Sequence, residues 1–207
     1  GLISLCVLFI AGAKIAHLIS VFISMIPLII MTIMNSSYML NRVMAFLKFQ
    51  DHTKGLGYQP FQALVGIGNG GFFGTGLGLG ESKHFYLPDP HTDFVFSILC
   101  EEIGFVGLLI VFAVFSILVY RGMKISYKAP DKMGQILAFG LTLMMSFYFL
   151  LHSFVNTGIV PATGVPLPFL SYGGMSLIFT MSSMGIILNI SSQTRISYPH
   201  LKQRRKS

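Results

Sequence analysis

The segment FVFSILCEEIGFVGLLIVFAVFSILVY, from Phe94 to Tyr120, decides the fold class of this chain, because only two glutamates and a few small residues interrupt a long apolar run. A helix needs about 20 apolar residues to cross the hydrocarbon core of a bilayer. Hydrophobic residues make up 53% of the chain and charged residues only 10%, whereas a soluble domain has ~25% charged residues. The predicted complete spans are Ile15–Met34, Phe94–Tyr120, Ile136–Val155 and Ser171–Ile190. We therefore expect an all-α, polytopic integral membrane protein.

Lysine and arginine are distributed unevenly between the two sides of this predicted membrane domain. One side receives ten of the 14 cations: Lys14, Arg121, Lys124, Lys128, Lys132, Arg195, Lys202, Arg204, Arg205 and Lys206. The other side receives only Arg42, Lys48, Lys54 and Lys83. Because positive residues accumulate in cytoplasmic loops, the first side is predicted to be cytoplasmic. The net charge of +7 thus indicates topology rather than nucleic-acid binding, and the basic tail is expected to contact anionic lipid headgroups.

The order of these segments predicts one membrane domain over residues 1–207. Residues 1–37 hold Leu2–Ala13 and the first complete span. Leu2–Ala13 is too short to cross a membrane and starts without an initiator methionine. We therefore expect it to be the cut end of a longer helix, in the C-terminal part of a larger protein. An extracytoplasmic loop follows in 38–92, the last three spans in 93–193 and a basic cytoplasmic tail in 194–207.

The connection from about Asn35 to Thr92 is too long for a plain connector and is expected to carry function. Its first part, Tyr38–Leu47, has the apolar spacing of a helix that lies in the membrane interface. Gly66–Gly80 has eight glycines in fifteen residues, which permit positive φ and close backbone approach. Either this loop makes tight turns against the membrane, or its amides form a nest for an anion. The neighbouring Lys83 and His84 favour an anion.

A second outer connection, Asn156–Leu170, contains Pro161, Pro166 and Pro168. Prolines fix extended backbone and end the preceding helix. The connection is predicted either to be a rigid external turn or to wall a cleft against the large loop.

Three ionisable residues, Asp89, His91 and Asp93, precede the apolar run at alternate positions. In extended backbone their side chains would point the same way. A carboxylate at the mouth of a membrane helix is costly to keep there, which makes Asp93 a candidate functional group. Its alternative role is that of an N-cap, which accepts hydrogen bonds from the first amides of the helix.

Six motifs in this chain resemble the SEDS family (shape, elongation, division and sporulation), whose best-known members are FtsW and RodA. They are Gln59–Leu64, Ile67–Gly71, Tyr86–Pro88, His91–Phe94, Glu101–Gly107 and Gly164–Gly174. The resemblance runs from about Arg42 to Ile190 with the motifs in the family order. Gly57–Gln59 and Gly78–Ser82 are closer to FtsW than to RodA. The chain departs from the family at Asp89, where glutamate is usual, and at His152 and Phe154, which replace an Asn-x-Gly pattern.

The resemblance implies a ten-helix glycosyltransferase of the bacterial inner membrane that polymerises lipid II into glycan strands during cell division or elongation. Its implied partners are a class B penicillin-binding protein and other membrane proteins of the division or elongation complex. Asp93 matches the family's essential aspartate on the extracytoplasmic face. The motifs imply substrate-binding roles for Gln59, Gln62, Gly70, Gly71, Lys83, His91, Thr92 and Ser171. Supporting structural roles are implied for Asp89, Glu101 and Glu102.

The residues suit this chemistry. A sugar hydroxyl must lose its proton as it attacks, and a general base contributes ~10²–10⁴-fold to such a step. We assign Asp93 as that base. The undecaprenyl pyrophosphate that leaves needs positive or N–H groups, for which Lys83, Arg42 and the glycine loop are available. Glu101 would lie ~12 Å farther along a straight helix, so a structural hydrogen bond is preferred for it over catalysis.

Other interpretations stay open at this point. A divalent cation, Mg²⁺ or Mn²⁺, bridging Asp89, His91 and Asp93 is an alternative to a site without a cofactor. The two cysteines, Cys6 and Cys100, lack the spacing of a zinc site. A transporter (flippase) of lipid-linked sugars would also use intramembrane acids and helices broken by glycine or proline. The third hypothesis is a non-catalytic scaffold of the division complex.

Overall fold

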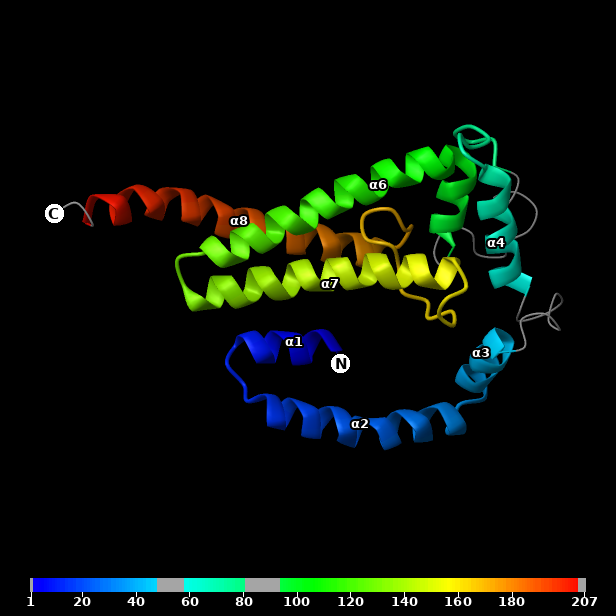
Figure 1. The fold of residues 1–207 in the computed structure, drawn as a ribbon, viewed down its shortest axis with the longest axis horizontal. Helices are drawn as coiled ribbons and strands as arrows, with labels where there is room; N and C mark the ends of the chain where they lie inside the picture. The colour runs from blue at the N-terminus through cyan, green and yellow to red at the C-terminus, as the bar shows by residue number, and fades with distance from the viewer. Residues whose placement is uncertain (1, 48–57, 81–93, 205–207) are drawn as a thin grey trace.

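A computed structural model describes the backbone of residues 2–47, 58–80 and 94–204, with side chains through Thr194 except that of Ala45. Within these residues all regular structure is helical, which confirms the predicted fold class (Figure 1). The helices are α1 (Leu2–Ile10), α2 (Ile15–Asn35), α3 (Ser37–Leu47), α4 (Tyr58–Gly70), α6 (Val95–Lys128), α7 (Lys132–Asn156) and α8 (Gly174–Arg204).

Four helices of the described chain are long and apolar enough to cross a membrane, as predicted. They are Ile15–Asn35, Val95–Lys128, Lys132–Asn156 and Gly174–Thr194. In Figure 1 they run in roughly the same direction, with α2 set apart from the other three, while α3 and α4 lie together at one end, which we call the α4 end. The helix predicted over Tyr38–Leu47 is α3.

Several predicted boundaries were wrong. The run from Phe94 is not one continuous helix, because α6 breaks at Gly104, and it ends at Lys128 rather than Tyr120. The stretch Arg121–Lys132 is therefore mostly helical, and only residues 129–131 connect α6 to α7. The last span begins at Gly174, not Ser171. The structure also adds α4, a helix that the sequence analysis did not identify within the large loop.

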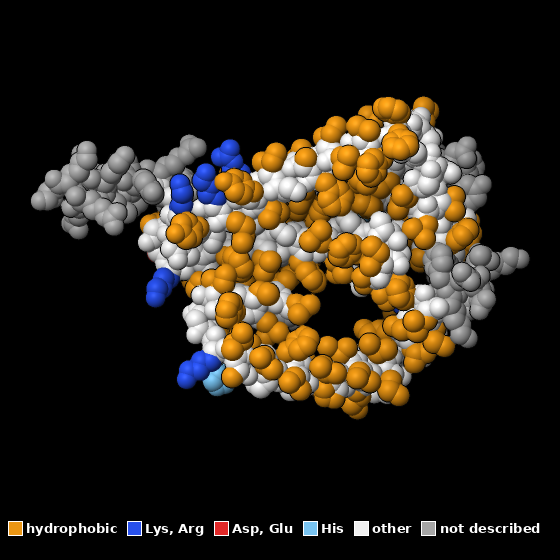
Figure 2. Space-filling model, in the orientation of Figure 1, with side chains coloured by type: hydrophobic (Ala, Val, Ile, Leu, Met, Phe, Trp, Pro, Cys, Tyr) orange, Lys and Arg blue, Asp and Glu red, His pale blue; other side chains and the backbone are white. Residues whose placement is uncertain are grey.

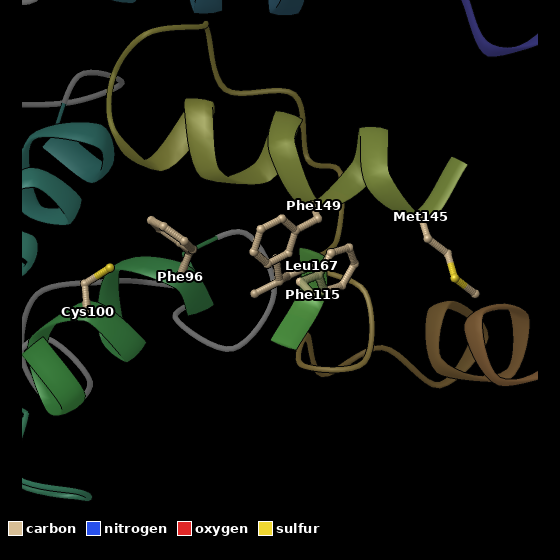
Figure 3. Packing of buried hydrophobic residues seen from close by; sticks show 6 residues of the cluster. All are labelled: Phe96, Cys100, Phe115, Met145, Phe149 and Leu167. Atoms are coloured by element: carbon tan, nitrogen blue, oxygen red, sulfur yellow. The ribbon is translucent and has the colours of Figure 1, made fainter. Parts of the chain in front are cut away.

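The main apolar core lies where α6 and α7 pack and where the α7–α8 loop folds back onto them. Its buried members are Phe96, Cys100, Phe115, Met145, Phe149 and Leu167 (Figure 3). The rings of Phe115 and Phe149 stack with centroids 4.0 Å apart. Phe112 meets Phe149 edge-on at 4.9 Å. Helix association in lipid depends on such close packing, because lipid tails are as apolar as the side chains themselves.

α2 takes no part in this core, because none of its residues is buried. Figure 2 shows an opening between α2 and the rest of the molecule, rimmed by hydrophobic side chains. Pro27 lies inside α2, where it removes one helical hydrogen bond and favours bending. A helix that is apolar all round suits lipid or further helices.

Positive side chains gather at the end opposite α4 on the face shown in Figure 2. Lys14 lies in the connection between α1 and α2, and Lys128 and Lys132 flank the turn from α6 to α7. The fold thus brings to one end cations that the sequence predicts to share one side of the membrane.

Candidate functional site

The break in α6 is the feature that organises the α4 end. Gly104 has φ 66° and ψ −171°, a backbone region essentially restricted to glycine. It separates a short segment, residues 95–103, from the long segment that follows, and the two meet at a sharp angle (Figure 1). Such a break removes helical partners from nearby carbonyl and amide groups, which must bond elsewhere.

The part of Gly66–Gly80 that follows α4, residues 71–80, supplies those partners. We call these residues the glycine loop from here on. Four backbone hydrogen bonds join it to the break, donor first: Thr75 to Glu101 (2.9 Å), Gly76 to Glu102 (3.1 Å), Phe105 to Gly71 (3.0 Å) and Val106 to Phe72 (3.1 Å). The hydroxyl of Thr75 also donates to the carbonyl of Glu101 at 3.1 Å. Because the loop amides of Thr75 and Gly76 bond to α6, the structure favours a tightly turned loop over an anion nest.

Two glycines allow this contact. Gly74 has φ +81°, and a Cβ on it would overlap the carbonyl of Glu102. A Cβ on Gly104 would come closer than 3.0 Å to the backbone of Phe72, Phe73 and Gly74. Each segment therefore needs both the conformation and the missing side chain of glycine where the two backbones meet.

Glu101 and Glu102 lie directly beside the end of the glycine loop. Glu101 is buried, and its Oε2 lies 3.0 Å from the position that a Cβ on Gly80 would occupy. The Cγ of Glu102 lies 3.3 Å from the same position. The break lies at Gly104, beyond Glu101, so the helical segment of residues 95–103 that carries Glu101 is continuous. The burial of Glu101 beside the loop supports its preferred structural role.

The acidic segment that follows Gly80 falls on residues 81–93, which lie outside the described part of the chain. Lys83, Asp89, His91, Thr92 and Asp93 belong to it. Their assigned roles, including the divalent cation alternative, stay predictions. Among the described residues, no three His, Cys, Asp or Glu side chains are placed to share a metal ion.

The first turn of α6, which directly follows Asp93 in sequence, is held from two sides. Phe94 is buried in a cluster with Ala63 of α4 and with Ile98. The Oδ1 of buried Asn156, at the end of α7, accepts a hydrogen bond from the amide of Ser97 at 3.3 Å. Sequence analysis missed Asn156, although an asparagine at the end of an apolar span was a signal that could have identified it.

The α7–α8 loop is fixed to its neighbours by polar contacts. His152, which departs from the family pattern, has its Nδ1 2.7 Å from the carbonyl of Val165. Arg42 of α3 lies over the ring of Tyr38 and donates from Nη1 to the carbonyl of Ala162 at 2.8 Å. These contacts favour the rigid external turn that the prolines predicted.

Ser171 is buried within that loop. Its Oγ accepts a hydrogen bond from the amide of Leu167 at 2.7 Å, and its own amide donates to the carbonyl of Leu167 at 3.0 Å. The Ser171 side chain thus closes a turn, and its predicted contact with substrate stays a prediction.

The remaining predicted binding residues lie on α4 or at its end. Ala63, Gly66 and Gly70 are buried, and helical spacing places Gln59 on the same face. A Cβ on Gly70 would overlap the carbonyl of Cys100, so Gly70 serves close packing against α6. Gln59 and Gln62 are half-buried, and Gly71 is exposed. α4, the glycine loop and the start of α6 thus bring Gly70, Gly71, Glu101 and Glu102 together.

Asn156→Leu is expected to destabilise the folded protein by about 1–3 kcal/mol. Leucine has a similar size but cannot accept the hydrogen bond from the buried amide of Ser97. Thermal unfolding in detergent measures the effect. Asn189→Leu is the matched control, since Asn189 is exposed on α8 and its loss should change little. Equal midpoints for the two variants would contradict the role of Asn156.

Comparison with known proteins gives consistent matches over nearly the whole chain. Residues 1–196 match a family model described as FTSW_RODA_SPOVE, cell cycle protein. The chain is 40% identical over 194 residues to a probable peptidoglycan glycosyltransferase FtsW of Geobacter sp. (strain M18), covering 93% of this chain and 53% of that protein. It is 41% identical over 190 residues to stage V sporulation protein E of Bacillus subtilis (strain 168), covering 91% and 51% respectively. The chain spans about half the length of the curated relatives it matches.

A solved structure has the same arrangement of helices. It was described under the heading of structural coordination of polymerization and crosslinking by a peptidoglycan synthase complex. The match has a TM-score of 0.70 at 26% identity and covers 91% of this chain and 52% of that one.

Proposed function

This chain belongs to the cell cycle protein family of FtsW, RodA and SpoVE, and on that basis we propose that it is part of a peptidoglycan glycosyltransferase that polymerises lipid II. The observation that carries the proposal is the 40% identity over 194 residues to a protein named for that activity. The family membership confirms the resemblance seen in the motifs.

In the proposed mechanism, Asp93 removes the proton from the attacking sugar hydroxyl. A base must be held in a defined position, because small displacements of reacting groups cost large factors in rate. The buried contacts of Phe94 and the hydrogen bond from Ser97 to Asn156 fix the turn that follows Asp93. These contacts support the assignment of this region as the site.

The leaving undecaprenyl pyrophosphate then depends on cationic side chains. The amides of Thr75 and Gly76 bond to α6, and we assign this role to Lys83 and Arg42. The guanidinium of an arginine has five N–H donors, so Arg42 keeps donors beyond those that bond the Ala162 carbonyl and the Tyr38 hydroxyl. Stabilisation of developing charge by such donors is a large part of catalysis in comparable sites.

We assign the site to the extracytoplasmic face of the inner membrane and a class B penicillin-binding protein as partner. The distribution of positive charge supports the extracytoplasmic assignment, because the cations gather at the end opposite α4 and positive residues accumulate on the cytoplasmic side. The similar solved structure, described as a complex for polymerization and crosslinking, supports a crosslinking partner.

A transporter of lipid-linked sugars is the second candidate, and the break in α6 is the observation that favours it. Discontinuous helices are common in transporters, where the freed backbone groups face a central substrate site. Here the break lies at the α4 end, and the glycine loop occupies the freed groups. This arrangement favours the glycosyltransferase.

The experiment that separates the two functions uses purified full-length protein, its partner and labelled lipid II. Glycan strands on a gel are expected for the glycosyltransferase. Translocation of lipid II across vesicles without strand formation would replace the proposal with the transporter.

The sidedness is tested by cysteine labelling in intact cells, after Cys6 and Cys100 have been replaced by serine. Thr163→Cys, in the α7–α8 loop, should react with a membrane-impermeant thiol reagent, whereas Lys128→Cys should react only after lysis. Both positions are exposed, so access to the reagent depends on the side. Labelling of Lys128→Cys from outside would reverse the topology.

A further inference from the structure

Four large apolar side chains of the glycine loop point away from the protein. Phe72 is 72% exposed, Phe73 86%, Leu77 79% and Leu79 71%. We call these residues the Phe72–Leu79 patch. A concentration of exposed apolar side chains within eight residues marks a surface that contacts another apolar phase or molecule.

The patch continues the exposed apolar face of α6. The ring of Phe72 meets the ring of Phe105 edge-on, with centroids 6.3 Å apart. Phe105, Leu109 and Ile110 are themselves exposed along the membrane-spanning part of α6. A side chain exposed on a spanning helix faces lipid unless another protein segment covers it.

The length of α6 sets the depth of the patch. Lys124 lies near the end of α6 that turns into α7, where a charged side chain reaches the headgroup level. Twenty residues back from Lys124 is Gly104, and twenty residues at 1.5 Å per residue span about 30 Å, the thickness of the hydrocarbon core. The break, and the glycine loop bonded to it, therefore lie at the opposite boundary of that core.

We propose that the Phe72–Leu79 patch is a lipid-binding surface, inserted among the acyl chains just below the headgroups at the α4 end. The four backbone hydrogen bonds between the loop and α6 hold it in place before it meets lipid. Insertion fixes the depth at which α4 and the first turn of α6 lie. This inference is independent of the proposed catalytic activity.

The test uses tryptophan fluorescence, because these 207 residues contain no tryptophan. Full-length Phe73→Trp protein is reconstituted in phosphatidylcholine vesicles that carry a doxyl quencher at acyl carbon 5 or 12, and the emission of the parent protein is subtracted. The shallow quencher is expected to act more strongly than the deep one, and iodide in the water should have little effect.

Val114→Trp is the depth control. Val114 is exposed on α6 and lies ten residues beyond Gly104, about 15 Å deeper, so the deep quencher should dominate there. Leu77→Trp replaces Phe73→Trp if the latter does not fold. Strong quenching by iodide would overturn the proposal, and so would the absence of quenching by either lipid, which would indicate that a protein partner covers the patch.

Discussion

Asp93→Asn in the full-length protein is expected to reduce lipid II polymerisation by about 10²–10⁴-fold, the usual contribution of a general base. The amide keeps the size of the side chain but cannot accept the proton. Membrane insertion and partner binding should persist, because asparagine also keeps the capping ability of aspartate. Glycan strands on a gel measure the loss.

A second aspartate provides the matched control. Asp131 caps α7, and its Oδ2 accepts a hydrogen bond from the amide of Gly134 at 2.8 Å. Asparagine caps a helix about as well as aspartate, so Asp131→Asn should polymerise normally. If Asp93 were also only a cap, the two variants would behave alike, and that result would end its assignment as the base.

Gly104→Ala is expected to destabilise the protein by about 2–6 kcal/mol. Roughly 1–3 kcal/mol comes from a side chain in a backbone region restricted to glycine. A further ~1–3 kcal/mol comes from overpacking, because the Cβ would overlap the backbone of the glycine loop. Loss of folded protein in thermal unfolding, together with loss of membrane yield, measures the effect.

Gly185→Ala tests whether any glycine-to-alanine change in a spanning helix has such a cost. Gly185 lies within α8, has no positive φ, and no atom lies within 4 Å of the position that its Cβ would occupy. Alanine there should leave stability unchanged or raise it by up to ~1 kcal/mol. A Gly104→Ala protein as stable as Gly185→Ala would refute the account of the break.

The spans were predictable because length and apolar composition alone decide whether a helix crosses a membrane. The break at Gly104 was not, since the apolar run continues on both sides of Glu101 and Glu102 and one glycine is tolerated in many helices. α4 was missed because its glycines and Pro60 resemble a loop. Pro60 lies in the first turn, where proline is tolerated, and close packing against α6 overrides the low helix propensity of glycine.

The candidate site was predictable in part. The motifs singled out Gly70, Gly71, Glu101 and Glu102, but the contact that the structure shows between their two segments was not predicted. The roles of Asn156 and His152 depend on contacts between segments that are remote in sequence, such as Ser97 with Asn156. Periodicity reports the environment of one helix and carries no information about such pairs.

The glycine loop and the α6 break depend on each other for their backbone hydrogen bonds. Each segment satisfies backbone groups that the other leaves without a helical partner, and the paired residues Thr75 and Glu101 are 26 positions apart. Neither can separate without exposing amides and carbonyls of both, so they form one cooperative unit. In hydrogen exchange, the amides of Thr75, Gly76, Phe105 and Val106 should therefore lose protection together, at one opening rate.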